Sequence, residues 1–462
     1  MMTLLEKKAT FSIASIYAFR MLGLFMILPV FSLYINDFKN ATPVMMGLAL
    51  GIYGLTQGIL QIPFGLCSDR IGRKPVIIFG LILFVIGSIV AAKSHSINML
   101  ILGRAIQGAG AIGSTLTALL ADHTAEEHRL KAMSVLGMTI GFSFIIALMI
   151  GPVLNSWIGL SGIFWFTAIL AIVGILVVLF LIPTPNHLFI QRDNEAVLGQ
   201  FKTILMMPEL LRLDFGIFCL HAILTALFVA VPIILVDHLD LANNHQWMIY
   251  LPVLLISFAL MLPFIIIAEK KRLMKPIFIG AIALLTFSEI LLGFFHQNII
   301  IMGLILILFF AAFTFLESSL PSLIAKIAPA GNKGTAMGIY SSAQFLGILA
   351  GGGLSGLVFS HFGFGSIFIL CAAIGLLWLA VSIFMKKPRH LSSKIITIGE
   401  LDEPAAKALQ AKLLATPGIF DAMVCPQEKI AYLKIDKQIF KDPEIFSDAA
   451  TPTAPKCSIP TA

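Results

Sequence analysis

Charged residues are scarce in this chain. Only 12% of its 462 residues are Asp, Glu, Lys or Arg, while 58% are hydrophobic. Ordinary globular domains carry roughly 25% charged and 45–50% apolar residues. A soluble protein of this length could not cover its surface with so few charges. The composition therefore excludes a soluble enzyme and indicates a membrane protein.

Cysteine is also rare, and its spacing does not suit metal binding or disulfide formation. The five cysteines lie far apart and form no C-x-x-C pair: Cys67, Cys219, Cys371, Cys425 and Cys457. This spacing argues against a zinc site and a disulfide framework, so we expect no metal and interpret the cysteines as apolar packing residues. Because no phosphate-binding loop or nucleophile–base pair is present either, we expect no enzyme and no bound cofactor.

Long apolar segments dominate what is present. They fall in blocks of about 20 residues, the length at which a helix crosses a bilayer. Two six-helix halves are predicted, at 1–182 and 211–389, joined by a cytoplasmic linker at 183–210. Hydropathy places their twelve spans at residues 10–36, 44–67, 75–93, 97–121, 130–155, 160–182, 211–236, 246–268, 276–295, 298–327, 333–360 and 364–385.

The basic residues indicate the orientation of these spans. With the N-terminus in the cytoplasm, twenty Lys and Arg residues fall on the cytoplasmic side and only Lys39 and Lys93 on the other. Because basic residues near spans resist translocation, both termini are predicted to be cytoplasmic. The net charge of +7 is therefore an orientation signal, and we expect no nucleic-acid partner. Lys7 and Lys8 precede the first span without a small-residue cleavage site, so we expect that span to be retained.

The two predicted halves repeat short motifs. Gln61-Ile-Pro-Phe at the end of span 2 matches Met261-Leu-Pro-Phe at the end of span 8. A second match aligns Ala118-Leu-Leu-Ala with Ser322-Leu-Ile-Ala. Parallel six-helix repeats are typical of secondary transporters, which bind their substrate between the halves near the midplane.

The loop between spans 2 and 3 carries the most specific motif. It resembles in full the signature G-x-x-x-D-R-x-G-R-[KR] of the major facilitator superfamily, through Gly65, Asp69, Arg70, Gly72, Arg73 and Lys74. The resemblance implies the twelve-helix fold of that superfamily and a cytoplasmic gate. In this gate Asp69 would bind the start of span 11, and Arg70 would pair with Asp122 at the end of span 4. The set would hold the outward-facing state closed on the cytoplasmic side.

Span 4 carries a second motif of the superfamily. Arg104-Ala-Ile-Gln107-Gly108 resembles R-x-x-Q-G. An arginine in mid-span costs at least ~2.5 kcal/mol on insertion, so it should face a water-filled cavity or a partner. We expect Gly108 and Gly110 to permit close helix packing.

Span 5 approaches the antiporter-type motif of the superfamily through Gly151 and Pro152. Asn155 and Ser156 follow where the family pattern has glycines, so this motif alone does not establish antiport. For Gly151 and Pro152 we expect a packing role, with Pro152 kinking the span.

Four ionisable residues lie inside spans 1, 4, 7 and 10: Arg20, Arg104, His221 and Glu317. The resemblance implies that these spans line the central cavity. We therefore expect the four to surround the substrate path, with Glu317 or His221 taking up the proton. Structural ion pairs are the alternative. The two arginines would suit an anionic or polar substrate unless Glu317 neutralises one of them.

Further polar residues accompany this set. Tyr53 and Gln57 share one face of span 2 and either line the cavity or bond to a neighbouring helix. Gln107 lies beside Arg104 in the span 4 motif. Glu289 is expected to have a structural or a neutral, protonated role, and Asp214 is expected at the membrane interface.

A soluble segment follows the last span. Residues 390–440 read as strand, helix, strand, strand, which indicates a small α+β module of the ferredoxin-like kind, either complete or without its last helix and strand. Residues 441–462 are expected to be disordered. Nearly the whole chain is similar to a group of bacterial inner-membrane, proton-driven efflux facilitators with such a C-terminal domain, most strongly in the first half and less after Asp436.

These observations predict a proton-coupled transporter of the inner membrane that exports a small organic compound and draws its energy from the proton gradient. Its expected partners are that compound, protons and the lipid bilayer. A symporter or uniporter for a metabolite is the alternative within the same class. The alternative of another class is a membrane sensor whose cytoplasmic tail binds a ligand.

Overall fold

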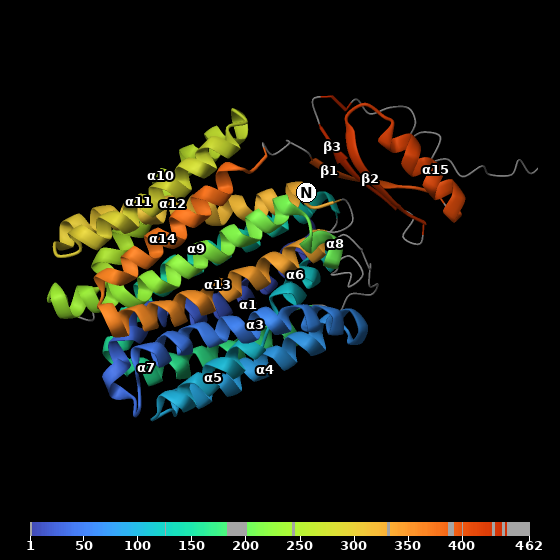
Figure 1. Ribbon diagram of the computed structural model, residues 1–462. Helices are drawn as coiled ribbons and strands as arrows, with labels where there is room; N and C mark the ends of the chain where they lie inside the picture. The colour runs from blue at the N-terminus through green and yellow to red at the C-terminus, as the bar shows by residue number, and fades with distance from the viewer. Residues whose placement is uncertain are drawn as a thin grey trace, which may run out of the picture.

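The computed structural model describes residues 2–124, 126–182, 201–242, 245–329, 333–386, 392–399, 401–426, 430–436 and 439–440. The chain forms a bundle of long helices with a small sheet domain at one end (Figure 1). We call this end, which also carries the N-terminus, the domain end, and the opposite one the far end. Among the described residues, ten helical segments are long and apolar enough to cross a membrane.

In the described residues of the N-terminal half, the α-helices are α1 (Leu4–Phe25), α2 (Leu28–Phe31), α3 (Pro43–Ile71), α4 (Arg73–Ala92), α5 (Ile97–Ala109), α6 (Gly113–Asp122) and α7 (Glu126–Phe180), and a 3-10 helix, η1 (Ser32–Asp37), follows α2. Predicted span 4 is divided because residues 110–112 are not helical. Predicted spans 5 and 6 run together in α7, across a kink where Gly159 has φ 66° and ψ 179°. These two features account for ten long apolar segments where the sequence predicts twelve spans.

The C-terminal half follows with α8 (Phe201–Leu205), α9 (Pro208–Ile233), α10 (Trp247–Lys270), α11 (Met274–Phe295), α12 (Ile299–Ile327), α13 (Lys333–Phe362) and α14 (Gly365–Ile383). Each of predicted spans 7 to 12 corresponds to one of the long helices. Most of the predicted linker, residues 183–200, lies outside the described residues. Large apolar side chains such as Trp157, Phe180 and Phe294 point outward, as expected of a surface that faces lipid.

Glycines let α3 of the first half run directly against α13 of the second. A Cβ on Gly47 would collide with the Gly352 carbonyl, and one on Gly51 would lie 2.6 Å from the Leu349 Cα. Nearer the domain end, the Ser342 hydroxyl donates to the Gly58 carbonyl at 3.0 Å. We call this contact the α3–α13 seam. Small residues of this kind permit close backbone approach where lipid supplies no hydrophobic drive between helices.

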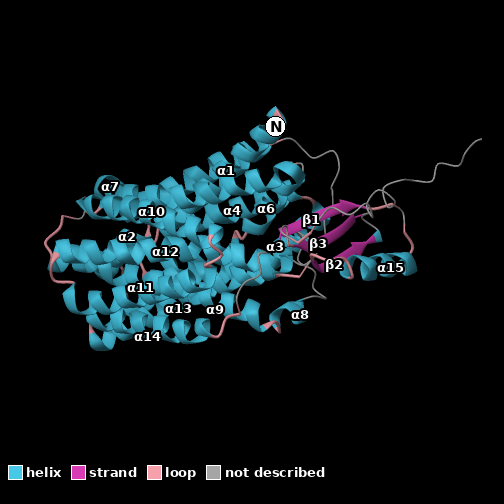
Figure 2. Ribbon diagram, turned by 90° about the horizontal axis from the view of Figure 1, so that it is seen from above, coloured by secondary structure: helices cyan, strands magenta, loops and turns pink. Residues whose placement is uncertain are grey.

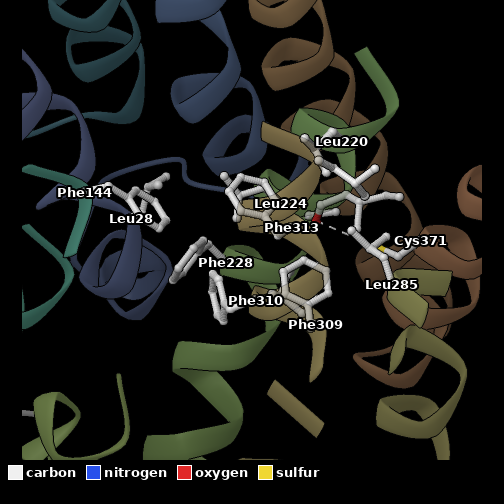
Figure 3. Close-up of a cluster of buried hydrophobic side chains, with 14 of the residues drawn as sticks. Leu28, Phe144, Leu220, Leu224, Phe228, Leu285, Phe309, Phe310, Phe313 and Cys371 are labelled. Carbon is white, nitrogen blue, oxygen red and sulfur yellow. Dashed lines mark hydrogen bonds between the residues drawn. The ribbon is translucent and has the colours of Figure 1, made fainter. Parts of the chain in front are cut away.

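Aromatic side chains join the two halves in the middle of the bundle. The Phe144 ring of α7 lies 6.2 Å from the Phe313 ring and 6.4 Å from the Phe310 ring of α12, measured between centroids. Phe228 of α9 packs 6.3 Å from Phe310, and Leu28 of α2 reaches the same group (Figure 3). This aromatic cluster packs the N-terminal half against the C-terminal half.

The C-terminal domain comprises β1 (Ser392–Thr397), α15 (Glu403–Leu414), β2 (Ile419–Cys425) and β3 (Ile430–Ile435). Its three strands are antiparallel in the order β1-β3-β2, and α15 packs on one face (Figure 2). This is the strand, helix, strand, strand order that the sequence predicts. Residues 441–462, for which disorder is predicted, lie outside the described residues.

The other face of this sheet meets the helical bundle. Lys434 on β3 is 3% exposed, and its Nζ donates to the carbonyls of Ala325 at 2.6 Å and Lys326 at 3.4 Å. These carbonyls belong to the last turn of α12. Carbonyl groups in the last turn of a helix have no hydrogen-bond partner within the helix itself. A lysine at this position also complements the negative end of the helix dipole. The domain thus holds the end of a membrane-spanning helix.

Candidate functional site

The signature loop folds into a tight turn between α3 and α4. Gly72 occupies φ 99°, a conformation that only glycine adopts without strain. This turn directs Arg73 back toward α3, where its guanidinium binds the Asp69 carboxylate and donates to the Ser68 hydroxyl at 2.7 Å. Its Nε also donates to Asp122 Oδ2 at 3.1 Å. Arg73 therefore ties α3 and α4 to the end of α6.

One predicted pair in this loop is wrong. Arg73, and not Arg70, contacts Asp122, while Arg70 is exposed. The physical reason is the turn at Gly72, which sets Arg73 at the start of α4 facing inward. Lys74 instead binds the Ile182 carbonyl after α7. The predicted contact between Asp69 and the start of span 11 falls beside residues 330–332, which lie outside the described residues, and it stays a prediction.

Two arginines of the N-terminal half both contact the side chain of Tyr53. Arg20 Nη2 lies 3.4 Å from the Tyr53 hydroxyl and donates to Gln57 Oε1 at 3.1 Å. The Arg104 guanidinium carbon lies 4.8 Å from the centre of the Tyr53 ring, within the range of a cation–π interaction. We call Arg20, Tyr53, Gln57 and Arg104 the arginine cluster. It explains the polar face predicted for span 2.

Neutral groups hold Arg104 in place. Its Nη1 donates to Gln107 Oε1 at 2.9 Å, and Gln107 Nε2 donates to the Ser88 hydroxyl at 2.7 Å. Its Nε lies 3.4 Å from the Ala49 carbonyl. The R-x-x-Q-G motif thus places an arginine and its positioning glutamine on successive turns of α5, with both side chains buried.

The C-terminal half holds the predicted proton-binding pair. His221 on α9 and Glu317 on α12 face each other, with 3.8 Å between Nδ1 and Oε2. The imidazole is 4% exposed and the carboxyl side chain 37% exposed. Glu317 is therefore the accessible member of the pair. The aromatic cluster borders this pair, because the centre of the His221 ring lies 6.1 Å from the centre of the Phe313 ring.

A third residue, Gln344 on α13, completes this group and is missed by sequence reasoning. Its Nε2 lies 2.8 Å from His221 Nε2 and 3.4 Å from Glu317 Oε1. A lone glutamine in a span rich in Gly and Ser has no distinctive pattern. The one sequence feature that could have pointed to Gln344 is a polar side chain in an apolar segment. We call His221, Glu317 and Gln344 the carboxyl cluster.

The structure thus divides the four predicted cavity residues between two clusters. Arg20 and Arg104 meet through Tyr53, and His221 meets Glu317. In the described part of the chain, Glu317 forms no ion pair with either arginine. The expectation that it could neutralise one of them therefore has no support in this conformation.

The predicted packing residues lie at close helix contacts. A Cβ on Gly108 would collide with the Tyr53 carbonyl of α3, and one on Gly110 with the Gly80 carbonyl of α4. Gly151 of α7 lies in the same way against the Met26 carbonyl, and Pro152 follows it within the helix. Each of these glycines allows two backbones to approach where any side chain would hold them apart.

Two other acidic residues are buried outside the clusters. Asp214, predicted at the membrane interface, lies near the start of α9 and is 6% exposed, so it faces the protein interior. Glu289 on α11 is fully buried, and within the described residues neither carboxylate oxygen has a hydrogen-bond partner. This position, away from the clusters, is compatible with the structural role predicted for it.

Comparison with known proteins identifies the family. The family model described as Major Facilitator Superfamily matches residues 13–352 and 272–443. The inner membrane transport protein YajR of Escherichia coli (strain K12) is 44% identical over 434 residues, which cover 94% of this chain and 95% of that protein. The chain belongs to the major facilitator superfamily.

Other members of this superfamily match in sequence or in fold. The class B tetracycline resistance protein of Escherichia coli is 32% identical over 165 residues, covering 34% of this chain and 40% of that one. The crystal structure of a D-xylose-proton symporter superposes with a TM-score of 0.65 at 17% identity, covering 82% of this chain and 97% of that one. The helical bundle is therefore a major facilitator fold, and the chain is a membrane transport protein.

Proposed function

We propose that this protein is a proton-coupled secondary transporter that exports a small organic compound by alternating access. It lies in the bacterial inner membrane with both termini in the cytoplasm, as the distribution of basic residues favours. The proton gradient supplies the energy, and the mechanism needs no metal or organic cofactor. The observation that carries the proposal is the carboxyl cluster.

A carboxyl group and an imidazole at this position suit proton transfer. Both exchange protons near neutral pH when their surroundings favour it, and ionisable residues inside spans commonly mark proton pathways. Glu317 is the accessible member, and Gln344 orients the pair from a third helix. Because α9, α12 and α13 each contribute one member, a change in the charge of Glu317 alters the attraction among three helices at once.

The fold supports alternating access. The α3–α13 seam and the aromatic cluster lie between the two halves, so they must open for the halves to rock against each other. The Asp69–Arg73–Asp122 network instead ties helices of one half together at the domain end. We infer that this network keeps that half rigid while the seam opens and closes.

Transport into everted membrane vesicles tests the proposal. A thermal-shift screen of the purified protein first identifies a compound that binds. We expect this compound to accumulate in vesicles with an acidic interior and to stop accumulating when an ionophore collapses the gradient. Accumulation that persists after collapse would contradict proton coupling. Accumulation only when the gradient is reversed would identify a symporter.

The Glu317→Gln variant tests the role of the carboxyl cluster. Because glutamine has the same shape but cannot release a proton, we expect gradient-driven accumulation to disappear while exchange of the compound across the membrane without a gradient continues. Glu403→Gln, the same change on exposed α15, is the control and should behave as the wild type. Full gradient-driven transport by Glu317→Gln would rule out this residue as the proton carrier.

A further inference from the structure

Within the part of the chain that the structure describes, the arginine cluster carries two positive charges without a negative partner. Arg20 and Arg104 are 2% and 1% exposed, and each is held by neutral groups. Arg20 Nε and Nη1 have no hydrogen-bond partner among the described residues. A buried cation is costly unless it is paired, so two in contact with one tyrosine call for an explanation.

The sequence excludes a counter-ion from within the same half. Residues 1–182 contain six acidic residues, all near the ends of helices: Glu6, Asp37, Asp69, Asp122, Glu126 and Glu127. Of these, Asp69 and Asp122 already bind Arg73, and Glu6 lies against His128. The apolar interior of this half therefore holds two arginines and no carboxylate.

Among the described residues of the opposite half, no carboxylate forms an ion pair with either arginine in this conformation. Glu317 lies in the carboxyl cluster, beside His221 and Gln344. A negative charge that reaches these arginines from a bound ligand would explain their burial.

The arginine cluster lies where a ligand would reach it during transport. Tyr53 packs in one apolar cluster with Phe345 and Ile348 of α13. At the adjacent Gly54, a Cβ would lie 2.5 Å from the Phe345 carbonyl and 3.2 Å from Ile348. The cluster thus lies under the α3–α13 seam. Separation of the two halves along the seam would uncover Tyr53 and the guanidinium groups beside it.

From these observations we propose that the arginine cluster is an anion-binding site and that the transported compound carries a carboxylate, sulfonate or phosphate group. Arg20 supplies two unpartnered nitrogens, Nε and Nη1, which lie on different edges of the guanidinium plane, so each can donate to an oxygen of such a group. Arg104 adds a second charge over the Tyr53 ring. Phe84, whose ring centre lies 5.9 Å from the Arg20 guanidinium carbon, supplies an apolar neighbour. This inference rests on the proposed transport function and specifies its substrate class.

Ligand-dependent thermal stability of the purified full-length protein tests the inference without transport. Benzoate, benzenesulfonate and inorganic phosphate are the anionic probes, and benzamide and benzylamine are the neutral and cationic controls. We expect the melting temperature to rise with the concentration of at least one anion and to rise less with either control. Equal stabilisation by benzamide, or no stabilisation by any anion, would overturn the proposal.

Arginine variants locate the site. Arg20→Gln is expected to weaken the binding of the stabilising anion by about tenfold or more, because a hydrogen bond to a charged group is lost along with the charge. Arg20→Lys should retain part of the affinity. Arg272→Gln, the same change at an exposed turn between α10 and α11, should bind as the wild type. Unchanged affinity in both Arg20→Gln and Arg104→Gln would overturn the proposal.

The stability of the ligand-free variant separates binding from a structural role. If Arg20 is an unpaired cation kept for a ligand, Arg20→Gln should leave the ligand-free melting temperature unchanged or raise it. If Arg20 is a structural ion, the same change should lower it. Glu317→Gln should still bind the anion, so failure of proton coupling and failure of the anion site give different results.

Discussion

Gln344 connects the two residues that we propose for proton transfer. Its amide nitrogen lies 2.8 Å from the His221 imidazole and 3.4 Å from Glu317. An amide nitrogen only donates hydrogen bonds, so His221 Nε2 is the acceptor and Nδ1, which faces Glu317, carries the hydrogen. Gln344 thereby sets the tautomer through which the two groups interact.

Replacing Gln344 by methionine should uncouple this pair. Methionine has a similar volume but donates no hydrogen bond, and a hydrogen bond to a charged group is worth about 1.5–3 kcal/mol. We expect gradient-driven transport to fall roughly ten- to hundredfold. Leu346→Met, two residues along α13 on an exposed face, is the control. Transport by Gln344→Met at the wild-type rate would show that the amide does not orient the pair.

The sequence singles out residues whose charge is unusual for their setting. Arg20, Arg104, His221 and Glu317 stand out because apolar spans rarely hold ionisable groups. Their grouping into two separate clusters depends on how the helices pack, which no local pattern contains. The prediction that Arg70 pairs with Asp122 failed for the same reason. Arg70 and Arg73 both follow Asp69 closely in sequence, and the backbone turn at Gly72 decides which of them points inward.

At the scale of helices, hydropathy predicts twelve spans, whereas the described residues form ten long apolar segments, with span 4 divided between α5 and α6 and spans 5 and 6 joined in α7. The pattern gives the length of each apolar block, because that length is set by the bilayer. It does not show the interruption at residues 110–112 or the uninterrupted run through Gly159. Both depend on backbone conformations of one to three residues, and a hydropathy average over a whole span does not detect them.

The α3–α13 seam offers a matched pair of glycines. A Cβ on Gly352 would collide with the Gly47 carbonyl of α3, whereas a Cβ on its neighbour Gly353 meets nothing within 4 Å. We expect Gly352→Ala to reduce transport strongly, because the seam can no longer close to this distance. The Gly353→Ala variant should transport normally and gain about 0.5–1 kcal/mol of stability, since alanine favours a helix over glycine.

Transport rates and melting temperatures of the two variants check this prediction. The informative result is the difference between them, because the residues are adjacent and the chemical change is identical. Equal transport by Gly352→Ala and Gly353→Ala would mean that close approach of α3 and α13 is not needed in the cycle. If Gly352→Ala alone reduces the amount of folded protein, the result still shows that α3 and α13 are in contact at Gly352.

At the scale of the whole molecule, Lys434 connects the C-terminal domain to the transport helices. Lys434 binds the carbonyls of Ala325 and Lys326 at the end of α12, and Lys326 in turn lies 2.5 Å from Glu269 of α10. Glu317 lies on the same helix, about two and a half turns away. A change in docking of the domain therefore acts on the helix that carries the proposed proton carrier.

Lys434→Ala should release the domain from the bundle. It removes the partner of two α12 carbonyls, so the last turn of α12 loses its cap and frays. Hydrogen exchange in the full-length protein measures this directly. We expect faster exchange at residues 322–327 and along β3, with the other helices unchanged. Lys412→Ala, an exposed lysine on α15, is the control and should exchange as the wild type. Identical protection of α12 in Lys434→Ala and wild type would show that the domain is held by other contacts and that this lysine does not couple it to α12.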